Sequence, residues 1–160
     1  MDAGKAFSRA AALCARSEHC ESDIRTKLRQ WQVDGSELDG IVARLKQEAF
    51  IDDERYARAL VHDKFLYNGW GRVKLAATLR QKGIAADVVT AALEQIDSNA
   101  YHSTLMRLLR GKWREVAGRE PRLARAALLR FAASRGFEAD MCYDAVEQLI
   151  ACPDEDSSTA

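Results

Sequence analysis

Apolar residues recur at three- and four-residue intervals along almost the whole chain. This spacing places them on one face of an α-helix, and no stretch shows the sustained two-residue alternation of a β-strand. We therefore predict an all-α fold with nine helices. The fourth helix runs from about Asp53 to Tyr67. The apolar positions of the others span Phe7–Cys14, Ile24–Trp31, Leu38–Leu45, Leu75–Leu79, Val89–Ile96, Leu105–Val116, Ala124–Phe131 and Cys142–Leu149.

Cap and turn residues divide the pattern at the same places. Ser36 and Asp52 are suited to N-cap the third and fourth helices, because their side chains can accept from free backbone N–H groups. Pro121 fits the first turn of the eighth helix, where its missing N–H costs little. The segment 68–71, Asn-Gly-Trp-Gly, is expected to be the loop between the fourth and fifth helices.

An internal repeat lies within the nine helices. Lys82-Gly83-Ile84 and Arg135-Gly136-Phe137 are 53 residues apart, and both match a helix end at which glycine is left-handed. In the first third, Gln32-Val33 takes the corresponding place without a glycine. We predict three tandem three-helix repeats over residues 5–50, 51–98 and 99–151, followed by a disordered acidic tail over 152–160. Stacking lets such small units bury their apolar faces, which favours an elongated, curved array.

Charge is unevenly distributed along the chain. The 24 basic and 24 acidic residues give a formal net charge of zero, which conceals two basic blocks. Residues 55–84 hold seven basic residues and one acidic residue, and residues 101–135 hold nine and two. Such local fields can attract a polyanion even when the total charge vanishes.

The basic residues recur at helical spacing within these blocks. Arg107, Arg110 and Arg114 share one helix face, and a similar set at 55, 58 and 62 precedes them by 52 residues. A solvated face would explain one such set, but the recurrence favours a surface for a polyanion or an acidic protein. The candidate binding residues are Arg55, Arg58, His62, Arg72, Lys74, Arg80, Lys82, Arg107, Arg110, Arg114, Arg122 and Arg125.

Trp70 stands between two glycines in the predicted loop. An aromatic ring in such a place can stack on a base or on a partner. A tryptophan in such a place is more often a local packing residue, so the sequence favours packing and leaves stacking as the alternative.

Catalytic and metal-binding patterns are absent from the sequence. It contains no glycine-rich phosphate loop, no G-x-S-x-G and no H-E-x-x-H. The run Asp52-Asp53-Glu54 suggests a metal cluster, but it directly precedes a helix, where capping and the helix dipole explain it. We therefore expect no enzymatic activity, no cofactor and no metal.

The location of the protein is predicted from three further observations. No apolar run approaches the length of a membrane span, and the first residues lack the apolar segment of a secretion signal. The four cysteines form no C-x-x-C pair and are expected to be reduced. We expect a cytoplasmic protein.

Several segments carry a family resemblance, including residues 15–20 and 23–28 of the first repeat. The run Phe50-Ile51-Asp52-Asp53-Glu54-Arg55-Tyr56-Ala57-Arg58-Ala59-Leu60-Val61 resembles the central motif of the RecX family, the bacterial regulators of the RecA recombinase. Gly69-Trp70-Gly71 and Leu79-Arg80-Gln81-Lys82-Gly83-Ile84 match the family's glycine-containing loop and its L-x-x-K-G-I helix end. The family usually has Ser where Cys20 stands and often has Gly where Ala49 stands. The resemblance covers about residues 6–97, and the last third is similar in architecture.

The resemblance implies a function in the regulation of homologous recombination, DNA repair and the SOS response. RecX-family proteins are all-helical and bind in the groove of RecA filaments on single-stranded DNA. They block filament growth and promote disassembly, which inhibits strand exchange and the RecA ATPase. The expected partners are the RecA filament and single-stranded and double-stranded DNA, bound by a monomer.

Two alternatives from other classes stay open. The chain could be a sequence-independent DNA-binding module, which predicts DNA binding that weakens steeply with salt. It could instead be a helical-repeat scaffold for another protein, which predicts no DNA affinity. A helix-turn-helix transcription factor fits less well, because the fifth helix offers mainly Arg80 and Gln81 for reading bases.

Overall fold

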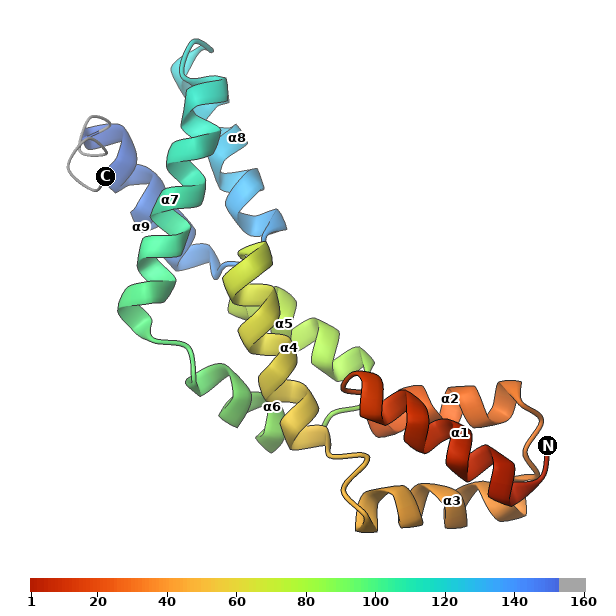
Figure 1. The fold of residues 1–160 in the computed structure, drawn as a ribbon. Helices are drawn as coiled ribbons and strands as arrows, with labels where there is room; N and C mark the ends of the chain where they lie inside the picture. The colour runs from red at the N-terminus through yellow and green to blue at the C-terminus, as the bar shows by residue number, and fades with distance from the viewer. Residues whose placement is uncertain (153–160) are drawn as a thin grey trace. The chain divides into compact units, whose positions relative to one another are not determined.

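The structure of the protein, a computed structural model, describes residues 1–152. Over these residues the chain forms nine α-helices and no strand, which confirms the all-α prediction (Figure 1). Except for Cys152, the predicted acidic tail with Pro153 lies outside the described residues. The helices are α1 (Ala3–Arg16), α2 (Glu21–Gln30), α3 (Gly35–Gln47), α4 (Asp53–Asn68), α5 (Arg72–Gln81), α6 (Ala86–Glu94), α7 (Ser98–Val116), α8 (Pro121–Ser134) and α9 (Ala139–Ala151).

The chain divides into two compact units. The first contains residues 1–61 and 78–92, and the second contains residues 62–77 and the chain from residue 93 onward. In the first unit α1, α2 and α3 pack against one another, and in the second α7, α8 and α9 do so (Figure 1). Because α4 and α5 each contribute to both units, the division into three repeats and the curved array stay predictions.

Each trio of helices encloses an apolar core. In the first unit, small residues of α1 such as Ala6 and Ala10 face Ile24 and Leu28 of α2, and all four are fully buried. In the second unit, leucines of α7 and α8 are buried together with Cys142, Val146 and Leu149 of α9. Burying each large aliphatic side chain contributes about 1.5–3 kcal/mol, so these faces fix the inward sides of the helices. Their outward sides are left for charged residues.

The ends of α2, α5 and α8 share one hydrogen-bond pattern. The backbone N–H of Ile84 donates to the carbonyl of Leu79 at 3.1 Å, and Gly83 has a φ of +76°. The end of α8 repeats this geometry, with a φ of +92° at Gly136. At the end of α2 the same bond joins residues 33 and 28, and Gln32 takes the left-handed conformation with a φ of +59°. The three helix ends align as the sequence predicts, and at one of them a glutamine replaces the glycine.

The capping predictions are partly corrected. Asp52 caps α4 as expected, since its carboxylate accepts from the Arg55 N–H at 3.1 Å. The prediction for Ser36 is wrong: α3 begins at Gly35, and its N-cap is Asp34, two residues before Ser36. Pro121 does begin α8, after the N-cap Glu120.

The cysteines are free thiols. Cys142 and Cys20 are buried, whereas Cys14 is half-buried and Cys152 is exposed. Burial raises the pKa of the Cys142 thiol, which disfavours the reactive thiolate. The apolar positions of Cys14 and Cys142 in their helices predict buried packing for both, which is confirmed for Cys142 but not for the half-buried Cys14.

Candidate functional site

The second unit carries a hollow of about 540 Å³ on the surface of α7 and α9. Arg107 and Arg110 line it from α7, together with His102 one turn earlier. The hydroxyls of Ser103 and Thr104, and the amide-bearing Gln148 of α9, complete its polar wall. Two guanidiniums beside an imidazole, hydroxyls and an amide supply the donors that bind a phosphate or a carboxylate.

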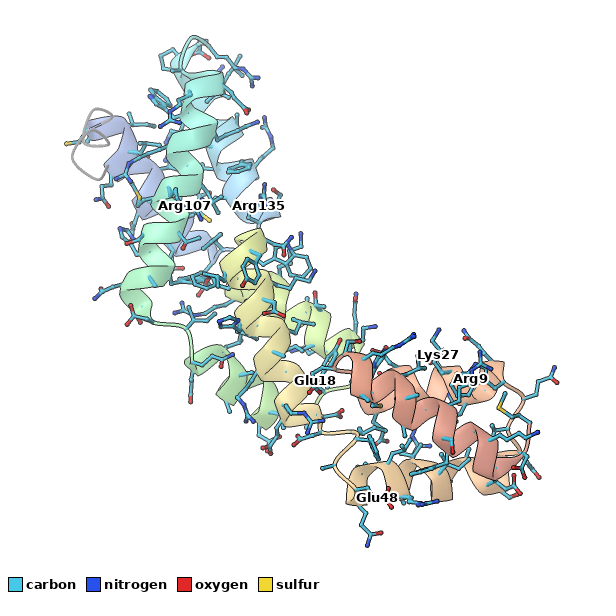
Figure 2. The ribbon with its side chains drawn as sticks, viewed as in Figure 1. Arg9, Glu18, Lys27, Glu48, Arg107 and Arg135 are labelled. Atoms are coloured by element: carbon cyan, nitrogen blue, oxygen red, sulfur yellow. The ribbon has the colours of Figure 1, made fainter. Side chains whose placement is uncertain are left out.

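The helix α7 presents these arginines because its other face is buried. Asp97 caps the helix by accepting from the Ala100 N–H at 2.9 Å, and Leu105 and Leu109 are fully buried. The basic positions 107, 110 and 114 lie on the remaining side, with Arg107 and Arg114 exposed and the side chain at 110 half-buried. Figure 2 labels Arg107 on α7.

Arg55 binds within the first unit. Its Nε donates to the Glu18 carboxylate at 2.5 Å, and its terminal nitrogen donates to the carbonyls of Ala49 and Phe50 at 3.1 and 3.3 Å. The hydrogen bond to Glu18, labelled in Figure 2, raises the pKa of the Arg55 guanidinium above its ordinary value. The side chain thus joins α4 to the chain around α1 and α3.

The other predicted residues of α4 are exposed. Arg58 lines a shallow hollow of about 220 Å³ that also contains Glu54 and Asp87. His62 lies with its Nδ1 3.1 Å from a carboxylate oxygen of Asp63. Acidic residues therefore lie next to Arg58 and His62, whereas the lining of the hollow on α7 contains no acidic residue.

Two predicted residues at the two ends of α5, Arg72 and Lys82, form ion pairs with carboxylates of their own unit. Arg72 donates to Glu138 at 3.0 Å, and its guanidinium lies 3.9 Å from the centre of the Tyr101 ring. Lys82 donates to Asp23 at 2.8 Å. Burial by itself would raise the pKa of Asp23, but hydrogen bonds from the side chains of Lys82 and Cys20 outweigh it and leave that pKa below its ordinary value.

The other two predicted residues of α5 are Lys74 and Arg80. The Lys74 ammonium is 4.5 Å from the centre of the Trp70 ring. Arg80 is exposed in the last turn of α5.

A second hollow, of about 320 Å³, lies among the helices of the second unit. Arg122 and Arg125 of α8 line it beside the apolar side chains of Trp113 and Ile150. Arg125 also donates to Glu147 of α9 at 2.6 Å, so its charge is partly compensated. The structure thus brings two pairs of predicted residues together, Arg107 with Arg110 and Arg122 with Arg125, with one pair in each of these two hollows.

Residues that the sequence interpretation did not select complete the first hollow. Three of them, His102, Ser103 and Thr104, precede Arg107 by about one turn of the helix. Helical spacing along α7 could therefore have predicted that they lie near Arg107. Gln148 reaches the hollow only because α9 packs on α7, and no local pattern indicates that.

The acidic run at the start of α4 has a structural role. The carboxylate of Asp53 accepts from the backbone N–H of Glu21 at 2.9 Å and so caps α2, whose own N-cap Cys20 makes no side-chain cap bond. Among residues 1–152, no group of three or more His, Cys, Asp or Glu side chains is arranged to hold a metal ion. Within the same residues, no helix combines the length and the apolar character needed to cross a bilayer.

Comparison with known proteins identifies the family. The family model described as RecX, second three-helix domain, matches residues 52–93. A regulatory protein RecX of Mycolicibacterium vanbaalenii is 32% identical over 158 residues, which cover 92% of this chain and 85% of that protein. A regulatory protein RecX of Leptothrix cholodnii is 31% identical over 135 residues, with 83% and 82% covered.

A solved structure shows the same fold. The crystal structure of RecX from Lactobacillus salivarius matches with a TM-score of 0.83 over 93% of this chain and 97% of that one, at 17% sequence identity. The helix order, the central motif and relatives above 30% identity over most of both chains agree. This chain belongs to the RecX family of regulatory proteins.

Proposed function

We propose that this chain is a negative regulator of the RecA recombinase that binds in the groove of the RecA–single-stranded DNA filament. Bound there, it blocks filament growth and promotes disassembly, which lowers strand exchange and RecA-driven ATP hydrolysis. It acts as a cytoplasmic monomer without a cofactor and without chemistry of its own. Membership of the RecX family supports a regulatory role.

The observation that carries the proposal is the hollow around Arg107 and Arg110. A nucleoprotein filament offers DNA phosphates and protein carboxylates, and a guanidinium can bind either with two parallel hydrogen bonds. The lining of this hollow contains no acid that would repel such a ligand. Charged contacts of this kind also speed encounter with a polyanion.

The twelve predicted residues divide into two roles under this proposal. Eight fully or partly exposed positions add to the attraction of the filament, while four residues whose bonds to carboxylates distant in the sequence are described above shape the surface. The first group is Arg58, His62, Lys74, Arg80, Arg107, Arg110, Arg114 and Arg122, and the second is Arg55, Arg72, Lys82 and Arg125.

The test is RecA-driven ATP hydrolysis on single-stranded DNA, titrated with this protein well below one molecule per RecA. The double variant Arg107→Glu/Arg110→Glu should raise the half-inhibitory concentration at least about tenfold, because two charged contacts become repulsive. The matched control is Lys27→Glu/Arg29→Glu, which changes the charge equally on exposed positions of α2 (Figure 2 labels Lys27). Circular dichroism and thermal unfolding establish that both variants fold.

Equal inhibition by the α7 variant and the wild type would reject the site. The two alternatives give other results. A plain DNA-binding module would bind DNA without RecA, and excess single-stranded DNA would restore ATP hydrolysis. A scaffold for another protein would neither bind DNA at low salt nor change RecA activity.

A further inference from the structure

Trp70 is held in a fixed loop at the end of α4. Gly69 has a φ of +66°, so the chain turns sharply after Asn68. Gly71 lies so close to Gly136 that a Cβ added to it would be 2.4 Å from the Gly136 carbonyl oxygen. The Gly71 N–H donates to the Arg135 carbonyl at 2.7 Å, and the Trp70 N–H donates to that of Lys64 at 3.1 Å. These contacts fix the backbone on both sides of a half-buried indole.

Two lysines lie against this indole. The Lys64 ammonium is 5.2 Å from the centre of the Trp70 ring, and the Lys74 ammonium is 4.5 Å from it. Arg135 is a further cation at this loop: it donates to the Asn68 carbonyl at 3.1 Å, and its guanidinium lies 5.3 Å from the centre of the Phe131 ring (Figure 2 labels Arg135). Two ammonium groups therefore lie against the indole itself.

Large apolar side chains around the loop are also exposed. Leu66, Tyr67 and Val73 are 55%, 75% and 53% exposed. Only seven large apolar side chains are exposed among residues 1–152, and three of them fall within these eight positions. Exposed apolar side chains next to cations are typical of a binding surface rather than of a solvated one.

The combination selects one class of ligand. An apolar protein segment would use Leu66 and Tyr67 but would gain nothing from the lysines, whereas a duplex would hide its bases from the ring. Single-stranded nucleic acid presents base faces that stack on indole and phosphates that pair with ammonium groups. A stacked base is favoured over an ammonium in the exposed cation–π contact, so each lysine can leave the ring for a phosphate.

We propose that Trp70, flanked by Lys64 and Lys74, is a stacking site for an unpaired base of single-stranded DNA. The proposal rests on the proposed function only in naming DNA as the nucleic acid. It assigns Trp70 to contact with the ligand and the two lysines to the phosphates on either side of the stacked base.

The first test measures binding of the full chain to two labelled oligonucleotides of equal length. One is an oligothymidylate, and the other has the same backbone with abasic sites throughout. Trp70→Ala should weaken binding of the oligothymidylate about tenfold and leave binding of the abasic strand within twofold, because only the first has bases to stack. Equal affinity of variant and wild type for oligothymidylate, or an equal loss on both strands, would overturn the proposal.

The control variant is Trp31→Ala. Trp31 is also half-buried with a cation over its ring, since Arg9 lies 4.3 Å from the ring centre. The Trp31→Ala variant should bind both strands as the wild type does. If it lost as much affinity for the oligothymidylate as Trp70→Ala does, the result would count against a specific site at Trp70. Trp70→Phe, which keeps an aromatic face, should retain most of the affinity and guards against a folding defect.

A second test separates the lysines from the ring. Lys64→Gln/Lys74→Gln should weaken binding of both strands and reduce the slope of log affinity against log salt by about 1.4, from two fewer phosphate contacts. An unchanged slope would remove the lysines from the site. None of these measurements contains RecA, so failure of the stacking site is distinguishable from failure of RecA inhibition.

Discussion

Two residues other than glycine have a positive φ among residues 1–152, Gln32 at 59° and Ala49 at 62°. Side chains with a Cβ adopt this conformation at a cost of about 1–2 kcal/mol. At the corresponding helix ends of α5 and α8 the chain has glycine, which adopts it without that cost. The end of α2 at Gln32 therefore contains local strain that the ends of α5 and α8 avoid.

Replacing Gln32 by glycine should stabilise the protein. The variant gains about 1–2 kcal/mol from relief of the left-handed conformation and loses about 0.5–1 kcal/mol to the greater freedom of the unfolded chain. We expect a net increase of about 0.5–1 kcal/mol in the free energy of unfolding, measured by urea denaturation.

The reverse change at Gly83 is the matched control. A Cβ there would meet no atom within 4 Å, so Gly83→Ala introduces strain of the backbone without a clash. It should lower the free energy of unfolding by about 0.5–1 kcal/mol. If Gln32→Gly lowered it as well, the left-handed strain would not be the controlling effect.

At the scale of elements, Tyr101 joins α7 to α5 and α9. The side chain is fully buried, and its ring centre lies 4.9 Å from that of Phe137 and 5.9 Å from that of Phe65. Its hydroxyl donates to the Glu138 carboxylate and accepts from the Arg72 N–H at 2.8 Å. One side chain therefore contributes an apolar ring and a satisfied polar group to the same junction.

Tyr101→Phe should destabilise the protein at neutral pH by about 1–3 kcal/mol. The ring contacts remain, but the Arg72 N–H and a Glu138 oxygen lose their partner inside the fold. Thermal unfolding of the variant measures the loss. A variant as stable as the wild type would mean that water replaces the hydroxyl without cost.

The same variant should change the response to alkaline pH. Burial, and next the hydrogen bond to Glu138, raise the pKa of Tyr101, so the folded state keeps a proton that the unfolded state releases above about pH 10. The contribution of the Tyr101 hydroxyl to the free energy of unfolding is therefore fully present below about pH 10. Above that pH it falls by at most about 1.4 kcal/mol per pH unit. Burial also raises the pKa of Tyr56 to about 12, so Tyr101→Phe should flatten the decline without abolishing it.

Sequence periodicity could predict the helices because each buried face is a local property. Gly83 and Gly136 could be placed for the same reason, since a helix end is encoded within a few residues. Asp53 shows the limit: its carboxylate caps α2, which begins 32 residues earlier, and only the tertiary fold brings the two together. Arg107 and Arg110 could be recognised from one helix, whereas the internal ion pair of Arg55 depends on the distant Glu18.

At the scale of the whole molecule, charged side chains join helices that are far apart in the sequence. In the first unit, Glu18 pairs with Arg55 and Asp23 pairs with Lys82. These pairs are partly exposed, so each contributes only about 0–1 kcal/mol, and salt weakens them. A single basic residue can therefore matter to the fold or to binding, and its sequence position alone does not separate the two roles.

Two variants, Arg55→Gln and Arg107→Gln, should separate a role in stabilising the fold from a role in binding the filament. Arg55→Gln removes the partner of Glu18 and two bonds to carbonyls, so we expect it to lower the free energy of unfolding by about 1–2 kcal/mol. Because most molecules stay folded, its half-inhibitory concentration for RecA should change less than about twofold. Arg107→Gln should leave unfolding within about 0.5 kcal/mol and raise that concentration about fivefold, the effect of about 1 kcal/mol of lost contact. The reverse pattern, with inhibition lost in Arg55→Gln at unchanged stability, would place the filament contact on α4 instead of α7.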